Sequence, residues 1–284
     1  MVPGRIVAGA LAVGGLALFA STAAVAAPDP ARGEYVFHMS GCASCHTAEG
    51  GAFLAGGRRL TTPFGDFLVP NITPDPDTGI GGWSAADLVR AMAEGVSPSG
   101  GHYYPSFPYT SYTRMRHEDI ADLKAYLDTV PAVRNDVGPH ELGFPFSVRL
   151  GNFFWKLLFF SPGPFVADPA RDAEWNRGAY LVNGPGHCGE CHTPRNILGG
   201  LDHDRALAGA TLPEGDGGKV PSLRGLDWSV EDFVWAFETG LLPDGDALGS
   251  SMADVITENT SKLTDADRRA IAVYLKSLSA LSTD

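Results

Sequence analysis

Cys42-Ala43-Ser44-Cys45-His46 and Cys188-Gly189-Glu190-Cys191-His192 decide the fold, because these two stretches contain all four cysteines of the 284-residue chain. Both read C-x-x-C-H, the attachment signature of a c-type haem. Two thiols separated by two residues can add to the two vinyl groups of one porphyrin, and the adjacent histidine can then bind its iron. The sequence therefore predicts two covalently bound haem c groups, with thioethers from Cys42, Cys45, Cys188 and Cys191 and iron ligands from His46 and His192.

Two other uses of paired cysteines fit the pattern less well. A thioredoxin-like C-x-x-C belongs in a βαβ setting and needs no adjoining histidine. A structural zinc site can use two C-x-x-C pairs, but it does not need a histidine after each pair. Haem attachment is therefore the favoured interpretation.

The two motifs lie inside an internal repeat. Gly33-Glu34-Tyr35-Val36 precedes the first motif, and Gly178-Ala179-Tyr180-Leu181-Val182 precedes the second. Further matched pairs follow each motif: Val69-Pro70-Asn71 with Val220-Pro221-Ser222, Trp83 with Trp228, Gly95 with Gly240, and Tyr126-Leu127 with Tyr274-Leu275. The repeat predicts two homologous haem domains, 28–134 and 169–284, joined by a linker at 135–168.

Each predicted domain is helical and rich in loops, with 35 Gly and 21 Pro in the chain. Ser84-x-x-Asp87 and Ser229-x-x-Asp232 are capping-box patterns, so helices should start there and end near Gly95 and Gly240. Thr264-x-x-Asp267 should start the last helix in the same way. Apolar stripes at helical spacing in both domains predict core packing; they contain Ile120, Leu123, Leu127 and Val130, and Ala270, Ile271, Tyr274, Leu275 and Leu278. No convincing strand pattern is present.

The chain has five methionines that could supply a second axial ligand. Met1 belongs to the leader, Met39 lies three residues before Cys42, and Met92 falls within a predicted helix. Met115 and Met252 each follow a loop and precede a closing helix, so we expect Met115 to bind the first iron and Met252 the second. Two alternatives stay open: a methionine that only fills a gap in the core, and bis-histidine ligation by one of His102, His117, His140 or His187.

Residues 1–27 have the pattern of a secretory signal peptide. Arg5 provides the positive start, Ile6–Ala20 is almost wholly apolar, and Ala24-Val25-Ala26 resembles a cleavage site. Cleavage would place the mature protein in the periplasm or outside the cell, whereas an uncleaved segment would be an anchor. The formal net charge of −12 disfavours nucleic acid as a partner.

The linker contains an apolar run, Phe153-Phe154-Trp155-Lys156-Leu157-Leu158-Phe159-Phe160. This run is too short to span a bilayer. We expect an interdomain helix that is buried between the two haem domains. The alternative is a surface patch that docks on a partner or peripherally on a membrane.

Between about Gly33 and Leu278 the chain resembles the cytochrome c subunits of membrane-associated bacterial alcohol, gluconate and sorbitol dehydrogenases. The most specific stretches are Asn71-Ile72-Thr73-Pro74-Asp75, Tyr104-Pro105-Ser106-Phe107-Pro108-Tyr109-Thr110-Ser111-Tyr112, and His187 through Asn196. In that family the motif histidines and loop methionines are the axial ligands, which here implies His46, His192, Met115 and Met252. Well-known members carry three haems and a C-terminal membrane helix, whereas this chain has two motifs and no apolar tail before Asp284, so we expect a two-haem relative.

We therefore expect an all-α fold of two tandem class I-like cytochrome c domains, joined by a partly apolar linker. The predicted function is a periplasmic dihaem cytochrome c with no catalytic site of its own. The expected electron donor is a periplasmic or membrane-bound dehydrogenase, and the acceptor is a downstream cytochrome, an oxidase or a quinone. The alternative is a dihaem enzyme, such as a peroxidase or a thiosulfate dehydrogenase, with one open haem site; a haem-based gas sensor is the weakest hypothesis.

Overall fold

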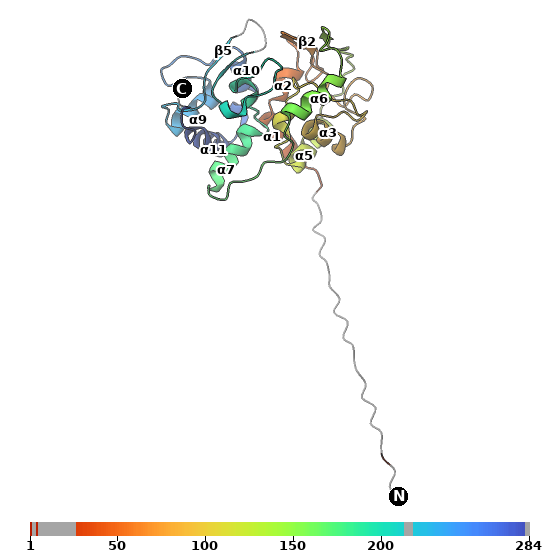
Figure 1. Ribbon diagram of the computed structural model, residues 1–284, viewed down its shortest axis with the longest axis horizontal. Helices are drawn as coiled ribbons and strands as arrows, with labels where there is room; N and C mark the ends of the chain where they lie inside the picture. Colours follow the sequence, from red (N-terminus) through yellow and green to blue (C-terminus); the bar gives the residue numbers. More distant parts are fainter. Residues whose placement is uncertain (2–3, 5–26, 213–217, 282–284) are drawn as a thin grey trace.

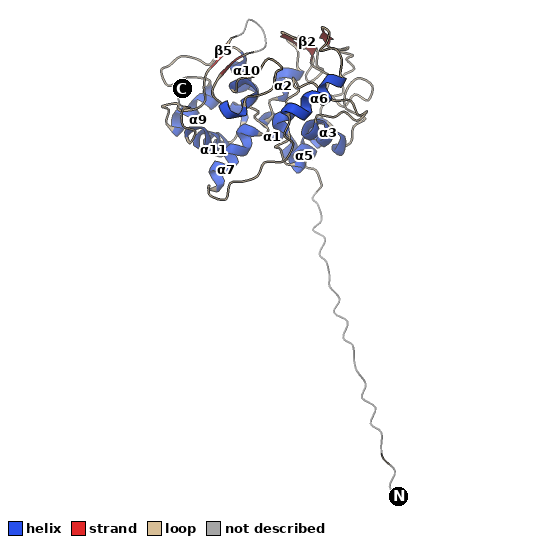
Figure 2. Cartoon of the chain, viewed as in Figure 1, coloured by secondary structure: helices blue, strands red, loops and turns tan. Residues whose placement is uncertain are grey.

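The computed structural model describes residues 1, 4, 27–212 and 218–281, so nearly all of the predicted signal peptide, 1–27, lies outside the described residues. We call residues 28–134 the first half and residues 169–284 the second half. The two halves lie side by side, with the strands and many loops along one edge of the molecule and most helices toward its middle and opposite edge (Figures 1 and 2). Within the described ranges, no helix has the length and apolar character needed to cross a membrane.

The helices of the first half are α1 (Pro30–Met39), α2 (Cys42–His46), α3 (Ala85–Glu94), α4 (Tyr109–Tyr112) and α5 (His117–Leu127). The linker contains α6 (Leu150–Phe159). The helices of the second half are α7 (Ala173–Asn183), α8 (Gly189–His192), α9 (Val230–Thr239), α10 (Ser251–Glu258) and α11 (Asp265–Lys276), with the short 3₁₀ helices η1 (His203–Arg205) and η2 (Thr260–Lys262).

Two small antiparallel sheets correct the all-α expectation. One contains β1 (Arg59–Thr62), β2 (Gly65–Leu68) and β3 (Glu141–Leu142), and the other pairs β4 (Ala210–Thr211) with β5 (Lys219–Val220). The sequence did not reveal these strands because none exceeds four residues. Their side chains are mostly half-exposed and lack the alternation of apolar and polar residues that marks a strand.

One helix pair in each half is packed at a glycine of the repeat. Helix α1 packs against α5, and α7 packs against α11. A Cβ atom on Gly33 would lie 1.9 Å from the carbonyl oxygen of Asp122, and one on Gly178 would lie 1.9 Å from that of Ala270. The repeated glycines therefore let the backbones of the two helices in each pair come into direct contact.

The predicted helix caps are confirmed. Ser84 and Asp87 form a reciprocal capping box on α3, as do Ser229 and Asp232 on α9. Helices α3 and α9 end at Gly95 and Gly240, each in the left-handed conformation, and the Thr264 side chain accepts from the backbone N–H of Asp267. The apolar stripes on α5 and α11 are packed in the core, with Ile120, Leu123, Ala270 and Leu275 at most 2% exposed.

Helix α6 is not buried between the halves, which corrects the preferred interpretation of the linker. Its buried residue among ten is Asn152, whereas Phe154, Leu157 and Leu158 are 56%, 68% and 71% exposed. The helix lies on the first half, where the Lys156 ammonium donates to the carbonyl of Glu94. The helix also contacts the second half, since the Trp155 indole N–H donates to the carbonyl of Leu198 at 2.8 Å and the Phe159 ring packs on Gly200. An apolar face is therefore left at the surface.

Candidate haem-binding sites

Each C-x-x-C-H motif forms a short helix directly after the long helix of its half. In the first half α2 follows α1 through Gly41, which adopts φ 59° and so turns the chain sharply. In the second half α8 begins after His187, a non-glycine residue with φ 39°. The structure therefore builds both motifs as single helical turns, in which two cysteines and the following histidine share one face.

The Nδ1 atoms of the two motif histidines are paired in the same way, each with a proline carbonyl. Nδ1 of His46 lies 2.8 Å from the carbonyl oxygen of Pro70, and Nδ1 of His192 lies 2.8 Å from that of Pro221. Because a carbonyl can only accept, each Nδ1 carries the proton and each Nε2 keeps its lone pair. Burial lowers the pKa of both imidazoles, so both rings are neutral at pH 7 and can bind a metal through Nε2.

The loop behind each histidine is constructed twice in the same way. The carbonyl of His46 accepts from the N–H of Gly56 at 2.7 Å, and that of His192 accepts from Gly209 at 2.8 Å. The hydroxyl of Thr47 accepts from Leu54 N–H, and that of Thr193 accepts from Leu207 N–H. Both leucines are buried with φ near +60°. These loops fix each histidine from its backbone side.

In both motifs the first cysteine is more buried than the second. Cys42 and Cys188 are half-buried against the core, and Cys45 and Cys191 are exposed. Burial raises the pKa of the Cys42 and Cys188 thiols to about 12, with a smaller contribution from the neighbouring cysteine. Each motif thus presents one thiol at the core and one at the surface. This donor set fits one porphyrin edge per motif, and the motif histidine remains the predicted iron ligand.

Met115 and Met252 lie in the core layer of their halves but in different settings. Met115 is fully buried between α4 and α5, whereas Met252 is a partly buried residue in the first turn of α10. Met39 and Met92, which we excluded as ligands, are 2% and 4% exposed core residues. Both Met115 and Met252 remain predicted ligands.

The four alternative histidines have varied surroundings. Nδ1 of His140 accepts from the N–H of Leu68 at 3.2 Å, and His102 Nδ1 lies 3.2 Å from the Lys156 ammonium. Nδ1 of His187 lies 2.8 Å from the carbonyl of Pro185, and His117 is exposed at the start of α5. None of these pairings requires a metal.

The zinc alternative has no support in the part of the chain that the structure describes. No three side chains of the His, Cys, Asp or Glu type gather there as a metal site would need. The two cysteine pairs each stay with their own histidine, which matches the chemistry of haem attachment.

Sequence reasoning missed two residues that orient the motif histidines. Val69-Pro70 and Val220-Pro221 were recognised as parts of the repeat, but not as the carbonyl partners of His46 and His192. The sequence did contain a signal for this role. The Val-Pro dipeptide recurs after each motif, and because neither side chain carries a polar group, its recurrence indicates a role for the backbone. Also missed was Glu190, which lies inside the second motif and bonds across to Thr110 and Ser111 of the first half.

Comparison with known proteins agrees with this geometry. A family model described as cytochrome c matches residues 30–131. The chain is 52% identical over 260 residues to the diheme cytochrome c-type protein of Cereibacter sphaeroides, covering 89% of this chain and 87% of that protein. It is 38% identical over 265 residues to the cytochrome c subunit of the quinone-dependent alcohol dehydrogenase of Gluconobacter oxydans, covering 88% of this chain and 55% of that protein.

A third relative is the fructose dehydrogenase cytochrome subunit of Gluconobacter japonicus, which is 37% identical over 262 residues. The match covers 89% of this chain and 53% of that protein, so the chain spans about half the length of these two dehydrogenase relatives. The chain belongs to the dihaem c-type cytochromes, in the family of the dehydrogenase cytochrome subunits, and it carries two covalently bound haem c groups and transfers electrons.

Proposed function

We propose that the chain is the electron-transfer subunit of a dehydrogenase, exported to the periplasm, and that its two halves are tandem cytochrome c domains. The haem groups supply reversible one-electron chemistry at iron. The protein supplies Cys42 and Cys45 for the first haem and Cys188 and Cys191 for the second. His46 and Met115 would bind the iron of the first haem, and His192 and Met252 that of the second.

The observation that carries this proposal is the pair of identical histidine–proline contacts. Each hydrogen bond from Nδ1 to a proline carbonyl fixes the ring and its tautomer, so that Nε2 would be presented to the haem iron. A ligand held in this way would move little when the iron gains or loses one electron, and a small structural change favours electron transfer.

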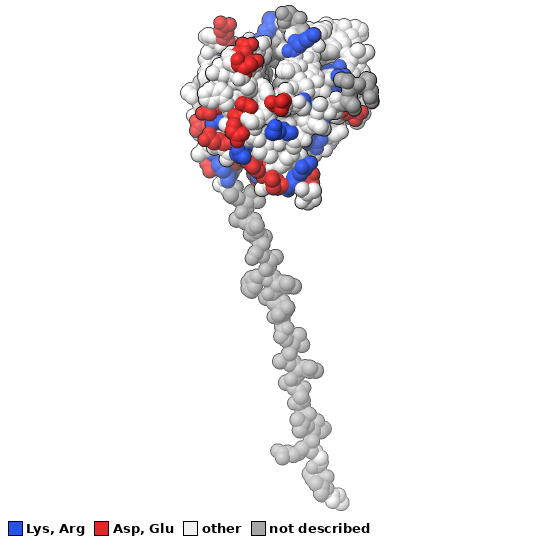
Figure 3. All heavy atoms as spheres, turned by 90° about the vertical axis from the view of Figure 1, so that its left-hand side faces the viewer, with Lys and Arg blue, Asp and Glu red and all other residues white. Residues whose placement is uncertain are grey.

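A dehydrogenase partner is supported by the relatives named as dehydrogenase subunits and by the surface of the linker. Helix α6 exposes Phe154, Leu157 and Leu158, and the 51% exposed Leu198 lies beside it, since its carbonyl accepts from Trp155. Exposed apolar surface of this kind is typical of a chain that works in an assembly. The outer face of the second half carries carboxylates and cations side by side (Figure 3). In this half Arg269 forms ion pairs with Glu174 and Glu231.

The test is purification of the native holoprotein from its own membranes and periplasm. We expect the protein to copurify with a dehydrogenase and its haems to be reduced when that enzyme's substrate is added. Leu157→Glu and Leu158→Glu on the exposed face should weaken the association, whereas Lys219→Glu on β5, away from α6, should not. A protein that purifies without partner from both fractions would contradict the proposal.

Ligation is tested separately by carbon monoxide. With His and Met on both irons, the native ferrous protein should bind carbon monoxide at neither haem. Stoichiometric binding at one haem would favour the dihaem enzyme with an open site instead.

A further inference from the structure

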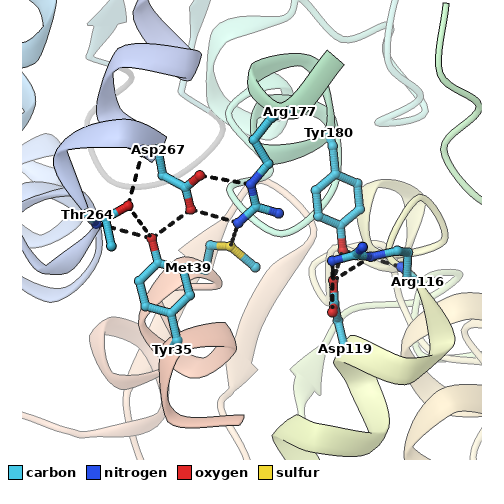
Figure 4. Close-up of polar contacts among 8 residues, drawn as sticks. All are labelled: Tyr35, Met39, Arg116, Asp119, Arg177, Tyr180, Thr264 and Asp267. Carbon is cyan, nitrogen blue, oxygen red and sulfur yellow. Dashed lines mark hydrogen bonds and ion pairs between the residues drawn. The ribbon is translucent and has the colours of Figure 1, made fainter. Parts of the chain in front are cut away.

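The two halves are joined by two equivalent contacts, in which a tyrosine of each half binds an aspartate of the other half. The hydroxyl of Tyr35 in α1 donates to Asp267 in α11 at 2.7 Å, and the hydroxyl of Tyr180 in α7 donates to Asp119 in α5 (Figure 4). Tyr35 and Tyr180 occupy equivalent positions of the repeat, two residues after Gly33 and Gly178. Each half therefore holds the first turn of the other half's closing helix.

The backbone completes this reciprocal arrangement. The N–H of Thr264, which precedes α11, donates to the Tyr35 hydroxyl at 3.1 Å, and the N–H of Arg116, which precedes α5, donates to the Tyr180 hydroxyl at 3.3 Å. Arg177 adds two further bonds to Asp267, at 2.8 and 2.6 Å. The Asp267 side chain is 11% exposed and Tyr180 is 5% exposed, so their polar groups strongly prefer the paired state.

The same interface reaches the second haem-attachment motif. Oε1 of Glu190 accepts from the hydroxyls of Thr110 and Ser111 at 2.6 Å each, and Oε2 accepts from Arg195 at 2.5 Å. The Glu190 side chain is only 9% exposed. A buried carboxylate with three donors holds its neighbours in place, because breaking any bond leaves a charge unpaired. Glu190 thus fastens α4 of the first half to α8 of the second.

The first motif is held from the opposite side. The Asn259 side chain, 4% exposed and located between α10 and α11, donates to the carbonyl of Met39 at 2.9 Å. Met39 ends α1, three residues before Cys42. Each half therefore contacts the chain at or beside the other half's attachment motif.

Tyr112 lies between the two motifs. Its hydroxyl donates to the carbonyl of Ser40, two residues before Cys42, at 3.3 Å. Its ring packs edge-on against the His187 ring, next to Cys188, with centroids 5.4 Å apart. Burial raises the pKa of Tyr112 well above its ordinary value, and the cysteines of the first motif and Glu190 of the second add to the effect. The phenol therefore stays protonated and close to both motifs.

We propose that Tyr112 is a positioning residue for electron transfer between the two haems, held between Ser40 and His187 at an interface that Glu190 and the Tyr35 and Tyr180 contacts fasten. In this transfer one electron leaves the ferrous iron of one haem and reduces the ferric iron of the other. No bond forms or breaks, and the phenol loses no proton. The side chain excludes water and sets the separation of the two attachment segments.

This separation matters because electron-transfer rates fall steeply with distance. Without the ring, a buried space would open between Ser40 and His187, and the two halves could shift or admit water. The inference rests on the proposed function only in requiring two haems that exchange electrons. Since its test uses the purified cytochrome alone, it can fail while the dehydrogenase assignment stands, and the reverse also holds.

The experiment compares Tyr112→Leu, Tyr112→Phe and Glu190→Gln as holoproteins with two haems confirmed by the pyridine haemochrome assay. The rate is measured in half-reduced protein by exchange spectroscopy of the haem methyl resonances. Pulsed dipolar measurements on the ferric protein give the distribution of iron–iron distances. We expect Tyr112→Leu to slow the exchange by about tenfold, since the rate depends on the geometry in which the two exchanging groups are held, and to broaden the distances.

Tyr112→Phe keeps the ring and loses only the bond to Ser40, so its rate should stay near that of the wild type. Glu190→Gln should slow the exchange less than Tyr112→Leu and broaden the distances. Matched controls are Ser44→Ala, at the position equivalent to Glu190, where the hydroxyl bonds only to Gly41 of its own half, and Tyr103→Leu, whose ring packs on Phe107 of its own half. Both should leave the distances unchanged.

An exchange rate in Tyr112→Leu within twofold of the wild type, with unchanged distances, would overturn the proposal. If Tyr112→Leu does not retain both haems, Glu190→Gln decides, and unchanged rate and distances in that variant refute the proposal.

Discussion

The two halves agree where they hold the motif histidines and differ where the methionines lie. Gly33 and Gly178, the loops behind His46 and His192, and the proline carbonyls correspond almost atom for atom. On the other side, Met115 follows the single turn α4, whereas Met252 lies within the two-turn helix α10.

This difference shows that the proline carbonyl that orients each motif histidine comes from its own half, whereas the segments near the methionines also contact the other half. Helix α4 and the turn before Met115 contact Glu190 of the second half. The segment after α10 contacts the first half through Asn259. Segments that meet different neighbours have no reason to keep the same length.

The largest expected effect tests the helix pairs that the two halves have in common, α1 with α5 and α7 with α11. Gly33→Val and Gly178→Val should each cost more than about 3 kcal/mol of unfolding free energy, because the added carbons would overlap a backbone carbonyl that cannot move away. Gly82→Ala and Gly249→Ala are the controls, since nothing lies within 4 Å of a Cβ atom there. Thermal unfolding followed by circular dichroism measures the change, and equal losses in test and control variants would contradict this account of the helix crossing.

The next prediction concerns the two methionines, which lie in different settings in the two halves. Met115→Ala should cost about 3 kcal/mol, the typical loss for a fully buried methionine, and Met252→Ala should cost less because Met252 is only partly buried. If both residues bind iron, each variant should also lose about half of the far-red sulfur-to-iron absorption, as expected for one thioether ligand of two. An unchanged band in either variant would reject that ligand.

A smaller effect is expected from pH at the interface. Burial opposes ionisation of Asp267, but the bonds from Arg177 and Tyr35 outweigh it, so the pKa of Asp267 lies below its ordinary value. The carboxylate therefore stabilises the fold above the unfolded-state pKa of about 3.9, and this contribution is lost as pH falls through the lower folded-state pKa. Asp267→Asn should destabilise the protein by about 2 kcal/mol at pH 7.

Denaturant titrations of Asp267→Asn and the wild type between pH 7 and pH 3 check the sign. The difference in unfolding free energy between them should shrink as the pH falls below about 4. A difference that stays constant over this range would show that the Asp267 charge does not stabilise the interface.

The smallest effect should be the same in both halves. Ser84→Ala and Ser229→Ala each remove one capping box and should cost about 1 kcal/mol. Ser84→Asp and Ser229→Asp should recover most of this loss, since aspartate is an equally good N-cap. Unequal losses in the two alanine variants would show that α3 and α9 are not equivalent elements.

Local chemistry made several features predictable. The capping boxes, the glycine helix ends and the apolar stripes follow from spacing within one helix, and all are found as expected. The short strands and the exposed position of α6 did not follow. A strand such as β3, with two residues, has no periodicity to detect, and an apolar run such as 153–160 has the same sequence whether it is buried or exposed.

The sequence by itself determined the two haem c groups and predicted their histidine ligands, because covalent attachment depends on residues that are adjacent in the chain, as in Cys42 to His46 and Cys188 to His192. Only the tertiary structure decided how the two motifs are held together. Tyr35 and Asp267, or Thr110 and Glu190, are far apart in the chain, and their hydrogen bonds depend on the packing of whole helices. Such contacts produce no recognisable pattern in the sequence, since each bond forms only when both halves have folded against each other.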